Sequence, residues 1–161
     1  MCIDGSENVA GSSGWQEVFI SLASAFRRYK KFLGFCAGRY GLSFGQLSIL
    51  LTMYRFPCLD SAGKIARKLD ITKGLASRNV DSLCRKGFLL AVEDRQDKRI
   101  VRLTMSQNAR RICRQVQRHS RRIYSAAAKG ICPRDMATAV AVLEKMSENM
   151  EKNGSGRNIF P

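Results

Sequence analysis

The chain has 161 residues, which is enough for one domain with a hydrophobic core. It carries 28 Lys and Arg against 13 Asp and Glu, a net charge of +15, and 45% of its residues are hydrophobic. This composition excludes a disordered chain and is typical of proteins that bind a polyanion: DNA, RNA or an anionic membrane surface. No apolar run reaches the roughly 18 residues that span a bilayer, and the polar, acidic first residues do not resemble a signal peptide, so we expect a cytoplasmic protein.

The first predicted element is a long helix that follows a flexible arm. Residues 1–14 are polar and rich in Gly and Ser, which predicts the arm. Gly38 and Gly41 are expected to end the helix. Its apolar side chains recur at steps of three and four, as on one face of a helix: Trp15, Val18, Phe19, Leu22, Phe26, Tyr29, Leu33 and Cys36.

Two shorter helices are predicted next. Ser43 and Gln46 have the spacing of a capping box, in which each residue satisfies a backbone N–H of the other. The helix that they open is stopped by Pro57. A third, short helix fits residues 62–69.

A fourth helix is predicted over residues 73–86. Thr72 can cap its start, and Gly87 suits the left-handed conformation that ends many helices. We expect this helix to turn four apolar side chains inward: Leu75, Ala76, Val80 and Leu83.

A β-hairpin with a strongly basic tip is predicted after this helix. Two short apolar runs, Phe88–Val92 and Ile100–Leu103, flank the charged segment Asp94–Arg99. Thr104 and Gln107 repeat the capping-box spacing and are expected to open a fifth helix.

The fifth and sixth helices are long and amphipathic. The fifth helix has an apolar side, predicted to consist of Met105, Ala109, Ile112, Val116, Ile123 and Ala127. Its other faces carry Arg110, Arg111, Arg114, Arg118, Arg121 and Arg122. Pro133 fits the first turn of the sixth helix, whose apolar residues have nearly coiled-coil spacing: Met136, Val140, Leu143, Met146 and Met150. Residues 153–161 are polar and predict a flexible tail.

This order of elements predicts a winged helix-turn-helix, which is mainly α with a small β-hairpin wing. The first, fifth and sixth helices have apolar faces larger than a small winged-helix core can cover. Full burial of one large apolar side chain is worth roughly 1.5–3 kcal/mol. A homodimer built from these N- and C-terminal helices would cover the faces, and it would present two recognition helices to DNA.

Several short motifs, in the right order, resemble the MarR (multiple-antibiotic-resistance regulator) family of transcription regulators. They are Leu42-Ser43-Phe44-Gly45-Gln46, Lys64-Ile65-Ala66-Arg67-Lys68-Leu69, Thr72-Lys73-Gly74-Leu75-Ala76-Ser77-Arg78, Leu83-Cys84-Arg85-Lys86-Gly87-Phe88-Leu89, Asp97-Lys98-Arg99 and Leu103-Thr104. The resemblance implies a single MarR-like domain over 15–152. Within it, 15–40 and 104–152 would be dimerisation helices and 43–103 the DNA-binding lobe. The resemblance also implies a small apolar or phenolic effector that binds between the dimer helices and this lobe.

The candidate DNA-binding residues fall into three groups. The first turns of the recognition helix meet base edges in such proteins, and they hold Thr72, Lys73, Gly74, Ser77 and Arg78. The wing holds Arg95, Lys98 and Arg99 for phosphate or minor-groove contacts, and the resemblance implies that Asp97 orients Arg99. Phosphate contacts, which set register and affinity, are predicted for Lys64, Arg67 and Lys68.

Other chemistries have less support in the sequence. No nucleophile motif, phosphate loop or zinc-type spacing occurs, so we expect no enzyme, cofactor or metal site. Cys36 and Cys113 are candidates for a thiol redox switch, because cations near a thiol lower its pKa, but a buried cysteine is commonly a small apolar residue.

The predicted function is a sequence-specific transcription regulator. It would bind a pseudo-palindromic operator in double-stranded DNA as a homodimer, most simply as an effector-responsive repressor, although activation stays open. Two alternatives also stay open: a redox-sensing regulator of the same fold, and a basic protein that binds nucleic acid without sequence preference.

Overall fold

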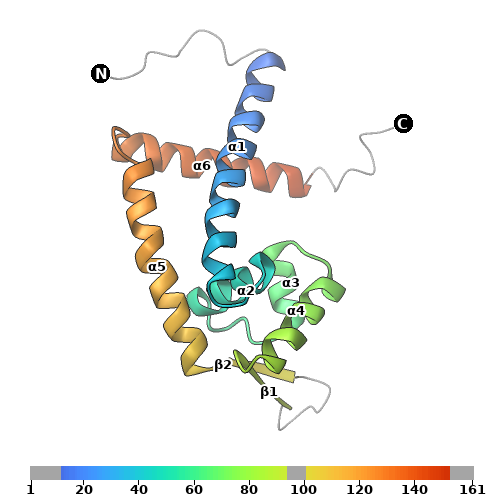
Figure 1. Ribbon diagram of the computed structural model, residues 1–161. Coiled ribbons are helices and arrows are strands. Elements are labelled where there is room, and N and C mark those ends of the chain that lie inside the picture. The colour runs from blue at the N-terminus through green and yellow to red at the C-terminus, as the bar shows by residue number, and fades with distance from the viewer. Residues whose placement is uncertain (1–11, 94–100, 153–161) are drawn as a thin grey trace. The chain divides into compact units, whose positions relative to one another are not determined.

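The computed structural model describes residues 12–93 and 101–152, and these form two compact units that divide after Gln117. The described residues form six helices and one two-stranded antiparallel sheet (Figure 1). The predicted fold class, a mainly helical chain with a small hairpin, is confirmed. Four residues predicted for the wing lie outside the described residues: Arg95, Asp97, Lys98 and Arg99.

The first two helices meet at a tight turn. Helix α1 spans Ser12–Gly38 and helix α2 spans Phe44–Arg55. Gly41, between them, has φ +63°, a left-handed conformation that glycine adopts at little cost. The predicted capping box is confirmed: Ser43 Oγ accepts from Gln46 N at 3.2 Å, and Gln46 Oε1 accepts from Ser43 N at 3.0 Å.

Helices α3 and α4 form the helix-turn-helix. Helix α3 spans Ala62–Leu69, as predicted, and helix α4 spans Lys73–Arg85. The turn between them passes through Asp70, whose backbone is left-handed with φ 50°. Thr72 caps α4, because its Oγ1 accepts from Leu75 N at 3.2 Å.

One side chain of α4 differs from the prediction. Ala76, Val80 and Leu83 are buried, but Leu75 is 42% exposed. The three buried residues recur at steps of four and three and define the inward face. Leu75 lies about 100° around the helix from Ala76, at the edge of that face. The prediction that Leu75 is a core residue was therefore wrong.

The sheet is the base of the wing. Strand β1 spans Leu89–Glu93 and strand β2 spans Val101–Met105, with Leu89 opposite Met105 and Glu93 opposite Val101. Gly87, with φ +71°, turns the chain from α4 into β1, as predicted.

The predicted start of the fifth helix was wrong. Thr104 pairs with Leu90 in the sheet, so it cannot cap a helix. Helix α5 begins at Gln107 and extends to Ala127, and its N-terminus is capped by Ser106, whose Oγ accepts from Ala109 N at 3.2 Å. The strand extends to Met105 because that side chain is buried in the core.

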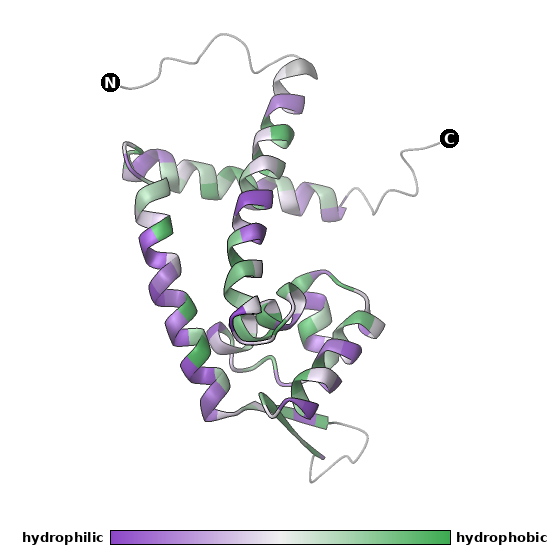
Figure 2. Ribbon diagram, viewed as in Figure 1, coloured by the Kyte–Doolittle hydropathy of each residue, from purple (hydrophilic) through white to green (hydrophobic). Residues whose placement is uncertain are grey.

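One hydrophobic core joins the elements of the first unit. Fully buried side chains come from α2, α3, α4, β1 and the first half of α5: Leu47, Ile49, Leu50, Ile65, Leu83, Leu89, Cys113 and Val116. Figure 2 shows hydrophobic residues clustered on α2 and on the adjoining part of α1, whereas α5 is mainly hydrophilic. The core fixes the positions of α3, α4 and the hairpin base relative to one another.

The second unit consists of the end of α5 and helix α6, which spans Pro133–Lys152. Pro133 is the first residue of α6, as predicted. No residue of α6 is buried, and Met136, Val140 and Leu143 are 42%, 49% and 40% exposed.

The predicted apolar side of α5 is buried over only part of its length. Ala109, Ile112 and Val116 are buried, but Ile123 is 40% exposed and Ala127 is also exposed. In the described part of the chain, no helix is both long and apolar enough to cross a membrane.

Candidate nucleic-acid interface

The start of α4 presents polar side chains to solvent. All five residues predicted to meet DNA are exposed: Thr72, Lys73, Gly74, Ser77 and Arg78. Ala76 and Val80, on the opposite side of the same turns, pack into the core. The first turns of α4 are therefore anchored by one face and free to contact a ligand with the other.

A cationic hollow of about 520 Å³ lies beside this surface. It joins three elements, because its walls come from the start of α3, the first residue of α4 and strand β2. Its lining residues are Asp60, Ser61, Gly63, Lys64, Arg67, Lys73 and Arg102. Four cations around one carboxylate make this hollow suited to a phosphate group.

The three predicted phosphate-binding residues do not all lie in this hollow. Lys64 and Arg67 line it, but the ammonium group of Lys68 lies 4.9 Å from the centroid of the Phe56 ring, in a cation–π contact. Arg102 lines the hollow and was missed by the sequence analysis. Its position in β2, beside the charged wing, is only weak evidence for a phosphate contact. The neighbouring residues do not indicate which face of the strand Arg102 occupies.

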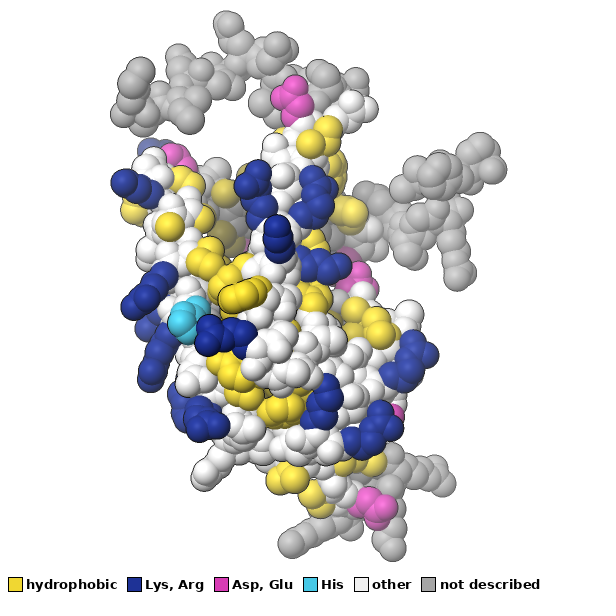
Figure 3. Space-filling view, viewed as in Figure 1, with side chains coloured by type: hydrophobic (Ala, Val, Ile, Leu, Met, Phe, Trp, Pro, Cys, Tyr) yellow, Lys and Arg dark blue, Asp and Glu magenta, His cyan; other side chains and the backbone are white. Residues whose placement is uncertain are grey.

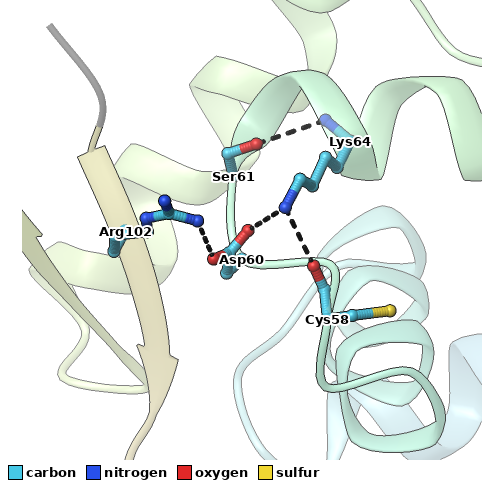
Figure 4. A network of polar contacts seen from close by, with 5 residues as sticks. All are labelled: Cys58, Asp60, Ser61, Lys64 and Arg102. Atoms are coloured by element: carbon cyan, nitrogen blue, oxygen red, sulfur yellow. Dashed lines mark hydrogen bonds and ion pairs between the residues drawn. The ribbon is translucent and has the colours of Figure 1, made fainter. Parts of the chain in front are cut away.

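Asp60 links the cations of the hollow to one another (Figure 4). Its carboxylate accepts from Lys64 Nζ at 2.7 Å and from Arg102 Nη1 at 2.6 Å. Lys64 also donates to the Cys58 carbonyl at 3.3 Å. The hydrogen bond from Lys64, and then that from Arg102, lower the pKa of Asp60 to about 2.

The backbone of Asp60 fixes the base of the wing. The Leu103 N–H donates to the Asp60 carbonyl at 2.7 Å, so the loop before α3 is bonded directly to β2. Leu103 itself is buried in the core. The carboxylate and the carbonyl of one residue therefore hold α3 and β2 together and set the spacing of the cations between them.

We expect Asp60→Asn to lower the thermal stability at neutral pH by about 1 kcal/mol, because partly exposed ion pairs contribute roughly 0.2–1 kcal/mol each. The pKa of Asp60 is lower in the folded protein than its ordinary value of 3.8. Its contribution is therefore present above pH 4 and lost as the pH falls towards 2. Thermal unfolding of wild type and Asp60→Asn from pH 7 to pH 2 measures the difference in their stability. This difference should disappear over that range. Asp81→Asn, at an exposed site, is the control. A stability difference between wild type and Asp60→Asn that does not depend on pH would contradict the stabilising role of the ionised Asp60 carboxylate.

The two cysteines considered for a redox switch are both buried. Cys36 is 6% exposed and Cys113 is fully buried. Burial raises the pKa of Cys36, and it raises the pKa of Cys113 to about 12 despite the nearby Arg110. Because the thiolate is the reactive form, this conformation does not favour oxidation of either residue. Across 12–93 and 101–152, no three His, Cys, Asp or Glu side chains are grouped so that they could hold a metal ion.

Comparison with known proteins points to one family. Residues 40–100 match the sequence model of the MarR family. The chain is 23% identical over 112 residues to the uncharacterised HTH-type transcriptional regulator YybA of Bacillus subtilis, and the match covers 70% of this chain and 74% of that protein.

Solved structures share the fold at low sequence identity. A MarR protein of Staphylococcus aureus, solved in complex with salicylate and kanamycin, has a TM-score of 0.77 at 19% identity, covering 89% of this chain and 96% of its own. FabT of Streptococcus pneumoniae, solved in complex with DNA, has a TM-score of 0.70 at 20% identity, covering 87% and 99%.

The motifs from Leu42 to Leu89 occur on the elements for which the resemblance predicted them, whereas Leu103-Thr104 lies in β2 and Asp97-Lys98-Arg99 lies outside the described residues. The helix-turn-helix of α3 and α4, the hairpin after Gly87 and the long helix α5 follow in the family's order. Residues 40–100, which match the MarR family, therefore form a winged helix-turn-helix of the MarR type.

Proposed function

We propose that this regulator binds a pseudo-palindromic operator as a homodimer. Each subunit would place the start of α4 in a major groove, and the wing residues Arg95, Lys98 and Arg99 would contact the backbone or the minor groove. Asp97 would orient Arg99, and Lys64 and Arg67 would bind phosphate. In its simplest form the protein is a repressor that an effector releases, in the cytoplasm.

The observation that carries the proposal is the position of α4 beside the cationic hollow. Ser77 and Arg78 are exposed on α4, and Lys73, at its first turn, also lines the hollow. A duplex whose phosphate occupies the hollow would bring base edges to Ser77 and Arg78. Phosphate contacts position the protein, and base contacts specify the sequence; this end of the lobe has residues for both.

Gly74 supports close approach of the α4 backbone to DNA. A Cβ atom added at this position would meet nothing within 4 Å in the free protein, so the packing of the fold does not require glycine. Glycine inside a helix costs roughly 0.5–1 kcal/mol relative to alanine. That cost is offset if the backbone of Gly74 lies against a phosphate, where a side chain would collide.

The apolar surface of the terminal helices supports the homodimer. On α1, the side chains of Trp15, Phe19 and Phe26 are 50%, 46% and 53% exposed, and all three belong to the apolar face identified in the sequence. Soluble monomers rarely expose large contiguous apolar patches. A second copy would cover the face on α1 and the uncovered apolar residues of α6.

We propose a small apolar or phenolic effector, on the precedent of the staphylococcal protein solved with salicylate. Such a ligand would bind between the dimerisation helices and the DNA-binding lobe. It can release DNA only to the extent that it binds one spacing of the two recognition helices more tightly than the other.

The proposal is tested by selecting duplexes from a random pool and measuring binding by fluorescence anisotropy over a salt series. We expect a palindromic consensus that binds about a thousandfold more tightly than a shuffled duplex of the same composition. Both duplexes should show strong salt dependence, because counterions are released in either case. Equal affinity for the two would favour a protein that binds nucleic acid without sequence preference.

A further inference from the structure

The start of α5 has two opposite faces. One face packs into the core through Ala109, Ile112 and Val116. The other carries Arg110, Arg111 and Arg114, all exposed. The proposed contacts of α4, α3 and the wing do not use these arginines. Figure 3 shows Lys and Arg side chains along α5, as a group distinct from those near α3 and α4.

The three arginines line one hollow of about 710 Å³, together with Gln107 and Asn108. Arg111 Nη2 donates to Asn108 Oδ1 at 3.0 Å, which directs its guanidinium along this surface. Helix α5 contains no Asp or Glu. Among the described residues, no carboxylate lies within salt-bridge distance of any of the three.

This arrangement opposes the stability of the helix. Arg110 and Arg114 are four residues apart and Arg111 and Arg114 three apart, and like charges at these spacings destabilise a helix by roughly 0.2–0.5 kcal/mol per pair. Arg110 also closes the first turn, where the helix dipole disfavours a positive charge. A bound anion would reverse both effects, so the free protein is electrostatically prepared for one.

We propose that the face formed by Arg110, Arg111 and Arg114 is a second DNA-contact surface, which binds phosphates without reading sequence; this rests on the proposed function. Gln107, at the start of α5, lies five positions along the chain from Arg102, in the cationic hollow. Extended chain of this length spans at most about 17 Å, and a duplex carries about ten phosphates over that length of its axis. One duplex that occupies the hollow can therefore reach the start of α5.

The test is the salt dependence of binding by a protein with Arg110→Gln, Arg111→Gln and Arg114→Gln. Because each subunit of the homodimer loses three phosphate contacts, the slope of log affinity against log salt should fall by about 5.4. Between 50 and 200 mM salt, wild type should then lose on the order of a thousandfold more affinity than the variant. The reduction should be equal for the selected and the shuffled duplex, so that the ratio of the two affinities is unchanged.

A matched control removes three cations from α6, with Arg134→Gln, Lys145→Gln and Lys152→Gln. The control variant loses as many positive charges as the α5 triple variant. Its slope of log affinity against log salt should nevertheless stay at the wild-type value. Arg111→Gln alone, with an expected reduction of the slope of about 1.8 for the two subunits, gives a second test that does not depend on folding of the triple variant. A wild-type slope in both α5 variants, or an equal reduction in the α6 control, would overturn the inference. If wild type binds the selected and the shuffled duplex equally tightly, the proposed function is overturned instead.

Discussion

A protein with Phe19→Asp and Phe26→Asp is expected to be a monomer and to bind its operator at least a hundredfold more weakly than wild type. Both side chains are about half exposed on the apolar face of α1, where the proposed partner copy would cover them. Carboxylates there would be buried without a partner, which costs several kcal/mol each. Each monomer then binds one half-site, and the gain of roughly 10²–10⁴ from linking two sites is lost.

Light scattering measures the mass of each protein, and anisotropy measures its affinity for the full operator and for a single half-site. The control carries Ser21→Asp and Ser24→Asp, which add the same charge to the same helix but lie away from the apolar face. It should stay dimeric. The α1 variant should bind the isolated half-site as well as wild type does. A dimeric α1 variant with unchanged affinity would show that this face is not the interface.

The helix-turn-helix could be predicted closely because its determinants are local. The capping box of Ser43 and Gln46, the cap at Thr72 and the left-handed Gly87 each depend on residues a few positions apart. Leu75 was misplaced because the inward face of α4 is narrow, and a residue at its edge is buried or exposed depending on the neighbouring element.

The errors elsewhere arose from tertiary contacts. Thr104 and Ser106 can both cap a helix, and only the pairing of Thr104 with Leu90 across the sheet decides between them. Likewise, the basic residues are evident in the sequence, but which of them meet in the cationic hollow could not be predicted from it. Arg102 enters the cationic hollow, where it pairs with Asp60, whereas Lys68 lies over the Phe56 ring; both contacts join residues that are distant in sequence.

Arg78 is expected to provide sequence discrimination, whereas Arg67 provides affinity alone. Arg78 is exposed on the turns of α4 that would meet base edges, and a bidentate arginine–guanine contact is worth about 1–3 kcal/mol of discrimination. Because a homodimer makes this contact twice, Arg78→Ala should lower the preference for the selected duplex by roughly 30-fold or more. Arg67 lines the cationic hollow, so its loss should weaken binding to every duplex alike.

The direct test of the account is therefore one comparison: the affinities of wild type, Arg78→Ala and Arg67→Ala for the selected and the shuffled duplex at one salt concentration. We predict that Arg78→Ala lowers the ratio of the two affinities by roughly 30-fold or more, while Arg67→Ala lowers both affinities by a similar factor and preserves their ratio. If Arg78→Ala also preserves the ratio, α4 does not read the sequence through this residue, and the proposed docking of the DNA-binding lobe is wrong.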